Sequence, residues 1–425
     1  MGHLLHRPNR ESTTQTAPDT QPRPPAAREP AGLELSWVMV RTTGLSLTRC
    51  IRINPRDCCT ANRRTFHDYY TPRDRPEVRI PIAKAKAHCG LYSSRGDRPT
   101  NEDRLRVGTL NKLVNKSTTE DKTMFYFAVI DGHGGQTCSE WLKENLHDHI
   151  EGVRSREIAK MVTAWRKEVG GYFARFRPQV LQDYIGGLDP DNTDQLSLEA
   201  RLTAAFLSAD LHYIRENAEA GAVASIALIQ SHDDQPFWNS STYTITSAHV
   251  GDTRILLCST EKGGLSEVLT TNHHPSSPAE LERLRRFTTR FTTDSFGTER
   301  FGQFANTRAF GDAKMKKVGV SAEPQLAVVD CHAESYAFMV MCTDGVTDVL
   351  SDQEIIDVVK TFDTDTPARA AEELVLLAQH LGTDDNASCC VVRLPAWEAD
   401  FSRVDYTKDL RKYRLENANV RDRRT

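Results

Sequence analysis

The sequence predicts an α+β fold built on antiparallel sheets. Segments with a period of two residues, typical of β-strands, dominate the second half of the chain, and a turn dipeptide joins two of them. Helical patterns form separate groups before and after these strands, as in α+β proteins. Two sheets packed face to face, with the helices outside, would use these elements well.

The first half of the chain contains one strong strand followed by helices. Residues 124–130, MFYFAVI, are aromatic and β-branched, which predicts a strand. Apolar residues three or four apart then predict a helix from Cys138, more helix over 155–186 and a long helix over 197–217. The polar segment 187–196 separates the last two.

Most of the strands are predicted in the second half. They are residues 223–230, 242–250, 254–259, 266–270, 326–329, 337–342 and 388–394. Gly251-Asp252 is a turn dipeptide, so we expect a hairpin between the second and third of these strands. Helices are predicted over 275–286, 352–361 and 367–381.

The first 67 residues differ from the rest of the chain. Residues 1–38 include a stretch rich in Pro, Ser, Thr and Arg, and we expect them to be disordered or a gene-model extension. Residues 39–67 are rich in Arg and hydroxyl residues and contain one acid, Asp57, which is typical of a mitochondrial presequence. We therefore expect Met39 to be the true start and the protein to lie in the mitochondrial matrix. An ordinary basic arm and a cytoplasmic location are the alternative.

Composition and charge exclude several classes of protein. Lys and Arg number 54 against 58 Asp and Glu, so a net charge of −4 does not favour nucleic-acid binding. No segment approaches the roughly 18 apolar residues of a membrane helix, so no transmembrane segment is expected. The ten cysteines contain no Cys-x-x-Cys, which disfavours a zinc site. Residues 398–425 are densely charged, and we expect a C-terminal surface helix or tail.

Carboxylates recur at the ends of predicted strands. Asp131 ends the first strand, Asp252 lies in the turn after Gly251, and Asp344 follows the strand 337–342. Each motif alone is also a common turn dipeptide. Carboxylates that converge at one sheet edge repel one another unless a cation neutralises them, and all-oxygen ligands suit Mg²⁺ or Mn²⁺. The pattern therefore predicts a divalent-metal site, to which Gly132 could add a carbonyl oxygen.

Six short motifs follow one another along the chain. They are RPTNEDR (98–104), FAVIDGHGG (127–135), SAHVGDTR (247–254), NTRAFGD (306–312), MCTDGVTDVL (341–350) and GTDDNAS (382–388). The series resembles the metal-dependent protein phosphatase family, type 2C, and within it the fungal mitochondrial branch. The resemblance implies a central antiparallel β-sandwich flanked on both faces by antiparallel helix pairs, in four layers. It also implies a catalytic domain over 68–397, with a helical insertion at about 151–196 and a flap at about 276–305.

The resemblance implies a role for each carboxylate. Asp131 would bridge two metal ions, and Gly132 would give its carbonyl to the second. Asp344 and Asp385 would bind the first ion directly. The other carboxylates would hold or contact metal-bound waters (Glu102, Asp103, Asp348) or form a weaker third metal site with Asp344 (Asp252).

The implied reaction is hydrolysis of phosphoserine and phosphothreonine in proteins. Two Mg²⁺ or Mn²⁺ ions would activate a hydroxide that attacks phosphorus in line. Arg98 would bind the phosphoryl group with its planar guanidinium, and His133 would protonate the departing oxygen. Phosphoproteins are the expected partners, and a monomer is favoured.

Two other hypotheses remain open. One is a catalytically inactive family member that acts as a regulatory or binding module. The presence of every metal carboxylate, together with Arg98 and His133, disfavours it. The other is a metal-dependent phosphatase of a small phosphorylated metabolite, because a two-metal centre recognises only the phosphoryl group.

Overall fold

The computed structural model describes most of the chain after residue 67. The described residues are 68–72, 77–110, 123–185, 196–216, 219–233, 235–287, 292–293, 299–300, 305–362 and 365–421. They belong to one compact unit, residues 63–425. The predictions for residues 1–38 and 39–67, including the presequence, lie outside the described residues, as do much of the flap and residues 186–195 of the insertion.

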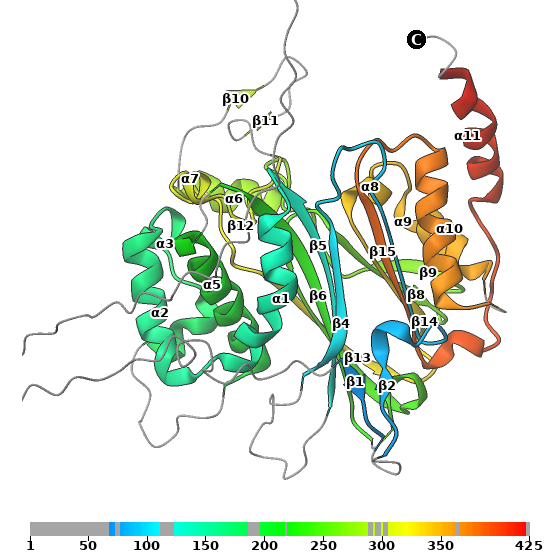
Figure 1. Ribbon diagram of the computed structural model, residues 1–425, viewed down its shortest axis with the longest axis horizontal. Coiled ribbons are helices and arrows are strands. Elements are labelled where there is room, and N and C mark those ends of the chain that lie inside the picture. Colours follow the sequence, from blue (N-terminus) through cyan, green and yellow to red (C-terminus); the bar gives the residue numbers. More distant parts are fainter. Residues whose placement is uncertain are drawn as a thin grey trace, which may run out of the picture. The chain divides into compact units, whose positions relative to one another are not determined.

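Two antiparallel sheets form the centre of this unit (Figure 1). The first has the order β13-β7-β6-β5-β4, with β12 paired to β6. Its strands are β4 (Arg104–Leu110), β5 (Met124–His133), β6 (Gly221–Ser231), β7 (Thr242–Val250), β12 (Phe310–Gly311) and β13 (Gln325–His332). The second has the order β3-β15-β14-β8-β9. Its strands are β3 (Cys89–Ser94), β8 (Arg254–Ser259), β9 (Leu265–Val268), β14 (Tyr336–Cys342) and β15 (Ala387–Arg393). Two further pairs are short: β1 (Tyr69–Tyr70) with β2 (Ile80–Pro81), and β10 (Thr292–Thr293) with β11 (Glu299–Arg300).

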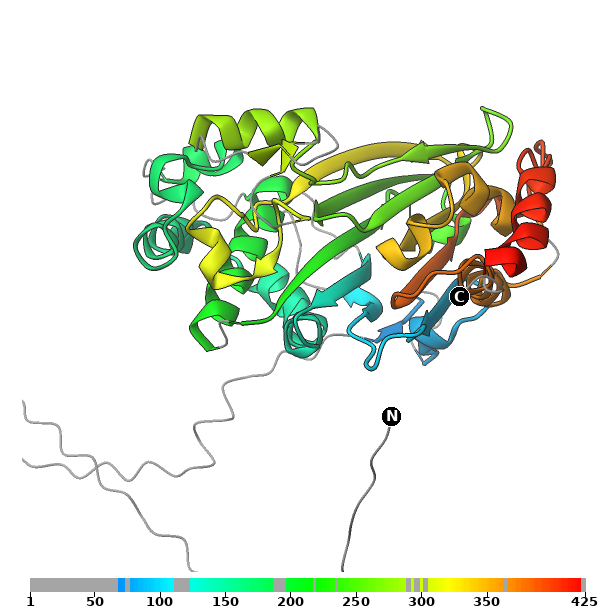
Figure 2. The same cartoon turned by 90° about the horizontal axis from the view of Figure 1, so that it is seen from above.

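Helices cover the outer face of each sheet, as both views show (Figures 1 and 2). The first sheet is covered by α1 (Thr137–Gly152) and α5 (Leu198–Glu216), with α2 (Ser155–Glu168), α3 (Tyr172–Arg175) and α4 (Gln182–Ile185) beyond them. The second is covered by α9 (Asp352–Lys360) and α10 (Pro367–His380), with α11 (Lys408–Arg421) against α9. The other described α-helices are α6 (Pro278–Phe287), α7 (Ala313–Lys316) and α8 (Asp344–Thr347). None of the described helices is long and apolar enough to cross a membrane.

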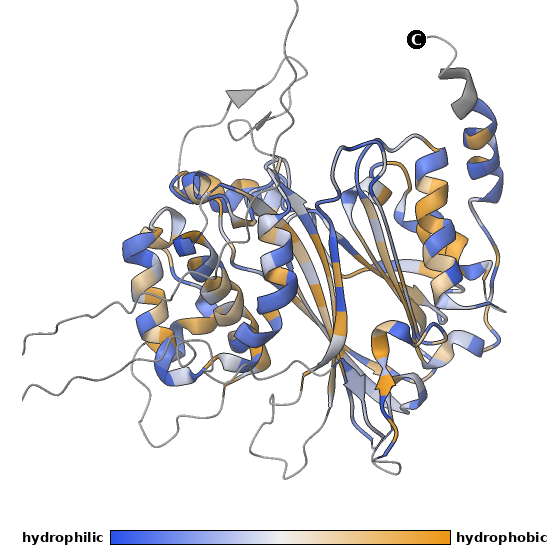
Figure 3. Cartoon of the chain, in the orientation of Figure 1, coloured by the Kyte–Doolittle hydropathy of each residue, from blue (hydrophilic) through white to orange (hydrophobic). Residues whose placement is uncertain are grey.

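The alternation of side chains in β5 explains the layers. Met124, Tyr126, Ala128 and Ile130 belong to the core under α1 and α5, whereas Phe125, Phe127 and Val129 belong to the core between the sheets. A third core joins the second sheet to α9 and α10. β5 is therefore apolar on both faces, and hydrophobic colouring recurs along the central strands (Figure 3). The predicted four-layer α+β fold is confirmed.

Three local predictions need correction. The turn at Gly251-Asp252 does not form a hairpin, because β7 pairs within the first sheet and β8 within the second. The helix predicted over 155–186 is broken at Gly170 and Gly171, whose φ angles of 72° and 58° are left-handed. The strands β3 and β4 were not predicted at all.

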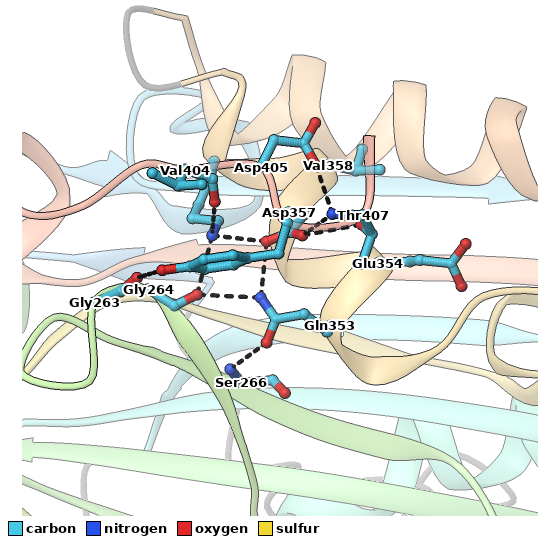
Figure 4. Close-up of polar contacts among 12 residues, drawn as sticks. Gly263, Gly264, Ser266, Gln353, Glu354, Asp357, Val358, Val404, Asp405 and Thr407 are labelled. Carbon is cyan, nitrogen blue, oxygen red and sulfur yellow. Dashed lines mark hydrogen bonds and ion pairs between the residues drawn. The ribbon is translucent and has the colours of Figure 1, made fainter. Parts of the chain in front are cut away.

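The C-terminal segment is attached to the domain by a buried lysine on α9 (Figure 4). The Lys360 ammonium donates to the carbonyls of Gly264 (3.1 Å) and Val404 (2.6 Å), and lies 2.7 Å from a carboxylate oxygen of Asp357. The other carboxylate oxygen accepts bonds from the backbone and hydroxyl of Thr407, both 2.9 Å. Both charged side chains are fully buried, so the segment covers them.

Replacing Asp357 should therefore destabilise the whole unit. Asp357→Asn leaves the Lys360 cation buried with only neutral partners and removes the anionic acceptor of Thr407. We expect the free energy of unfolding to fall by about 3 kcal/mol, measured by urea denaturation.

The matched control is Asp400→Asn, on the exposed side of the same segment. It should change stability by less than about 0.5 kcal/mol. The double variant Asp357→Leu/Lys360→Met, which leaves no buried charge, should be more stable than Asp357→Asn. Equal stability of Asp357→Asn and Asp400→Asn would contradict the assignment.

Candidate active site

Loops from both sheets meet at one end of the sandwich and enclose a cavity of about 560 Å³. Asp131, Gly132 and His133 are the last residues of β5 in the first sheet. Asp344 follows β14 and Asp385 precedes β15, both in the second sheet. Asp252 lies in the crossover from β7 to β8. The connection from β7 to β8 crosses from the first sheet to the second, and it brings the Asp252 carboxylate to the same cavity.

Three aspartates form the centre of the site. One carboxylate oxygen from each of Asp131, Asp252 and Asp344 lies within 4.8 Å of the others. The second oxygen of Asp252 accepts a bond from Asn306 (2.9 Å), while its Oδ1 is buried and has no hydrogen-bond partner among the described residues. An unpaired buried carboxylate oxygen facing two other carboxylates fits a hard divalent cation.

The pKa values of these groups reflect the same crowding. Burial raises the pKa of Asp131 well above its ordinary value, and the charges of Asp103 and Asp344 raise it further. Burial, with the charge of Asp252, also raises the pKa of Asp344 to about 7. Without a cation the cluster therefore retains protons near neutral pH, and a cation would displace them.

Glu102 and Asp103 occupy different positions. Glu102 lines the cavity and accepts a bond from the backbone of Gly135 (3.0 Å). Asp103 is 3% exposed and lies behind the cavity, where it accepts a bond from the Thr343 hydroxyl (2.9 Å). Burial raises its pKa to about 6. Asp348 lies at the end of α8, and its backbone N–H bonds the carbonyl of Asp344 (2.8 Å).

Arg98 is brought to the rim of the cavity by the β3–β4 loop. Its guanidinium lies 2.7 Å from a carboxylate oxygen of Asp385, and more than half of its side chain is exposed. Asn386 holds this loop in place, because its side chain accepts from the backbone of Glu102 (2.7 Å) and donates to the carbonyls of Arg95 and Thr100. The guanidinium therefore lines the same cavity as the carboxylates, and part of it is open to solvent.

His133, the last residue of β5, lines the same cavity as Arg98. Its Nε2 is 2.7 Å from a carboxylate oxygen of Asp312. Burial alone would lower the pKa of His133, but the hydrogen bond and charge of Asp312 raise it above the ordinary value. The imidazole is therefore suited to carry a proton.

Several residues that shape the site have no role in the sequence predictions. His273 accepts a bond from the backbone of Gly251 (2.9 Å) and so holds the turn that carries Asp252. Asn306, Asn386 and Asp312 hold Asp252, the Arg98 loop and His133 respectively. All three lie inside the six motifs, and this position is the sequence signal that could have identified them as part of the site.

The chain is similar to known proteins over most of its length. The family model for protein phosphatase 2C matches residues 91–387. Protein phosphatase 2C homolog 4 of Schizosaccharomyces pombe is 40% identical over 371 residues, which are 85% of this chain and 93% of that protein. Protein phosphatase 1K, mitochondrial, of Xenopus laevis is 29% identical over 72% of this chain and 68% of its own length.

Two solved structures share the fold. A phosphatase from a pathogenic strain of Toxoplasma gondii has a TM-score of 0.52 at 17% identity and covers 73% of this chain and 93% of its own. A C. elegans sex determining protein has a TM-score of 0.51 at 22% identity and covers 74% of this chain and 67% of its own.

The raised pKa of Asp344 predicts how the metal-free protein responds to pH. An acid whose folded-state pKa is above its unfolded value stabilises the fold at low pH, and this stabilisation is lost as the pH rises through the folded value. In EDTA, the wild type should therefore lose stability relative to Asp344→Asn between about pH 4 and pH 7, by on the order of 1 kcal/mol or more. Thermal unfolding at a series of pH values measures this difference.

Added Mn²⁺ should make the wild type more stable than Asp344→Asn. The wild type should gain several degrees of thermal stability, and Asp344→Asn should gain little. Asp330→Asn is the matched control, since Asp330 accepts a bond from Thr244 at the far end of the first sheet (2.7 Å). An equal Mn²⁺ response in all three proteins would exclude Asp344 as a ligand.

Proposed function

The chain belongs to the protein phosphatase 2C family and is a metal-dependent protein serine/threonine phosphatase, and we propose that two Mg²⁺ or Mn²⁺ ions act in its aspartate cluster. The cluster of Asp131, Asp252 and Asp344, open to one cavity with Arg98 and His133, is the observation that carries the proposal. Three carboxylates within 4.8 Å carry more negative charge than one divalent ion neutralises.

The remaining ligand assignments follow the motif positions. Asp131 would bind both ions, the Gly132 carbonyl would bind the second, and Asp344 and Asp385 would bind the first. The groups that would hold or contact bound waters are Glu102, Asp103 and Asp348, and Asp252 with Asp344 would hold a weaker third ion. When bound, the ions supply a nucleophilic water at neutral pH and offset charge on the phosphoryl oxygens.

The chain's own side chains bind the substrate and move the proton. Arg98 presents a planar guanidinium beside the carboxylates, which fits two phosphoryl oxygens once it turns from Asp385. His133, on another rim of the same cavity, donates a proton to the serine or threonine oxygen as the P–O bond breaks. The substrates we propose are phosphoproteins.

We also propose that the protein acts in the mitochondrial matrix. The support is the Arg-rich, acid-poor segment 39–67 and the relative from Xenopus laevis named as mitochondrial. Mass spectrometry of the N-terminus of protein isolated from cells tests this. A mature chain beginning near residue 68 supports the proposal, and an intact N-terminus with a cytosolic fractionation pattern contradicts it.

Phosphate release from a phosphothreonine peptide is the central test. Activity should require Mn²⁺ or Mg²⁺, stop in EDTA and fall on the order of 100-fold or more in Asp344→Asn. Arg98→Ala should lower kcat/KM by about 10- to 100-fold, because a hydrogen bond between charged groups contributes about 1.5–3 kcal/mol. Asp330→Asn should match the wild type.

The same assay separates the alternatives. No metal-dependent release by a folded protein that still responds to Mn²⁺ would favour the regulatory module. Faster turnover of small phosphorylated metabolites than of phosphopeptides would favour a metabolite phosphatase.

A further inference from the structure

Asp312 has an unusual backbone conformation next to the active site. Among the described residues it is the one non-glycine with a positive φ, at 49° with ψ 47°. It immediately precedes α7, yet its side chain does not cap that helix. Its carboxylate instead turns to His133, with Oδ2 2.7 Å from Nε2. A left-handed non-glycine residue is strained, and such strain is retained where surrounding structure enforces it.

Gly221 provides the space for this pair. It is the register partner of both His133 on β5 and Gly311 on β12. A Cβ atom on Gly221 would lie 2.3 Å from Nε2 of His133 and 2.5 Å from Oδ2 of Asp312, too close for either. The hydrogen-bonded pair therefore lies directly on the backbone of β6.

A buried ion pair fixes the chain on both sides of Asp312. Asp210 on α5 and Lys316 on α7 are fully buried and 2.9 Å apart. The same oxygen of Asp210 accepts the backbone N–H of Gly311 (2.8 Å), and Lys316 donates to the carbonyl of Ala309 (2.5 Å). Residues 309–316 are thus tied to α5, and Asp312 cannot move without breaking buried polar contacts.

We propose that Asp312 is a positioning residue that holds the His133 ring through Nε2–H, so that Nδ1 delivers the proton to the leaving oxygen. This inference rests on the proposed role of His133. In the step, the electron pair of the breaking P–O bond goes to the serine or threonine oxygen. That oxygen takes the proton from Nδ1, and water supplies the new oxygen on phosphorus. The neutral imidazole keeps its Nε2–H on Asp312 and recovers a proton from solvent at Nδ1.

The dependence on the leaving group tests this role. A threonine oxygen is a poor leaving group and needs the proton, whereas p-nitrophenolate leaves without it. Asp312→Asn keeps the size of the side chain, and Asn tolerates the left-handed backbone. It should lower kcat on a phosphothreonine peptide by about 10- to 100-fold and change kcat on p-nitrophenyl phosphate by less than about 3-fold.

A double-variant cycle distinguishes positioning from an independent effect. In a His133→Asn background, Asp312→Asn should cause no further loss on the peptide. Gly221→Ala, which displaces the pair without removing a charge, should reproduce the selective loss. Asp330→Asn should leave both substrates unaffected.

The opposite results would refute either the positioning role of Asp312 or the proton-donor role of His133. Equal losses on both substrates in folded Asp312→Asn and Gly221→Ala, or an additive loss in the double variant, would refute positioning through His133. If His133→Asn itself shows no selective loss on the peptide, the proposed role of His133 fails. If His133→Asn still hydrolyses p-nitrophenyl phosphate with added metal, the proposed metal-dependent phosphatase activity stands.

Discussion

The repulsion among buried carboxylates at the meeting edge of two sheets is the constraint on which the rest of the structure depends. Asp131 and Asp344 come from different sheets, and Asp252 comes from the crossover between them. Burial raises the pKa of all three carboxyl groups, and neighbouring negative charges raise those of Asp131 and Asp344 further. Because the three carboxylates repel one another, holding them close together requires a rigid sandwich. It also requires polar groups outside the cluster that hold each loop in place.

Those supports come from loops of both sheets and from one helical layer. His273 holds the turn with Asp252, Asn386 holds the β3–β4 loop, and Thr343 holds Asp103. The helical layer takes part as well, because Asp210 on α5 ties down the segment that reaches His133. The chemistry is carried by few side chains, but their placement is distributed over contacts that are far apart in sequence.

The sequence predicted most of the architecture because both faces of the central strands are apolar, as in β5 and β14. It failed for β4, where Arg106 interrupts the apolar pattern; this charge is neutralised by Asp68, a contact visible only in three dimensions. It failed for β3, where Ser93 and Ser94 bond Ser388 and Gln379. The metal carboxylates were recognisable from their motifs, whereas the Asp210–Lys316 anchor had no local signature because its members are more than 100 residues apart.

The place of β3 in the second sheet has a consequence for how the chain is made. Among the described strands β3 pairs only with β15, and Cys89 on β3 lies beside Cys390, 301 residues later. During synthesis, β3 emerges long before β15, the strand with which it pairs. Such non-local pairing makes folding slow, and an unpaired strand edge is prone to aggregate. β3 therefore remains an unpaired edge until the chain has been made as far as β15, residues 387–393.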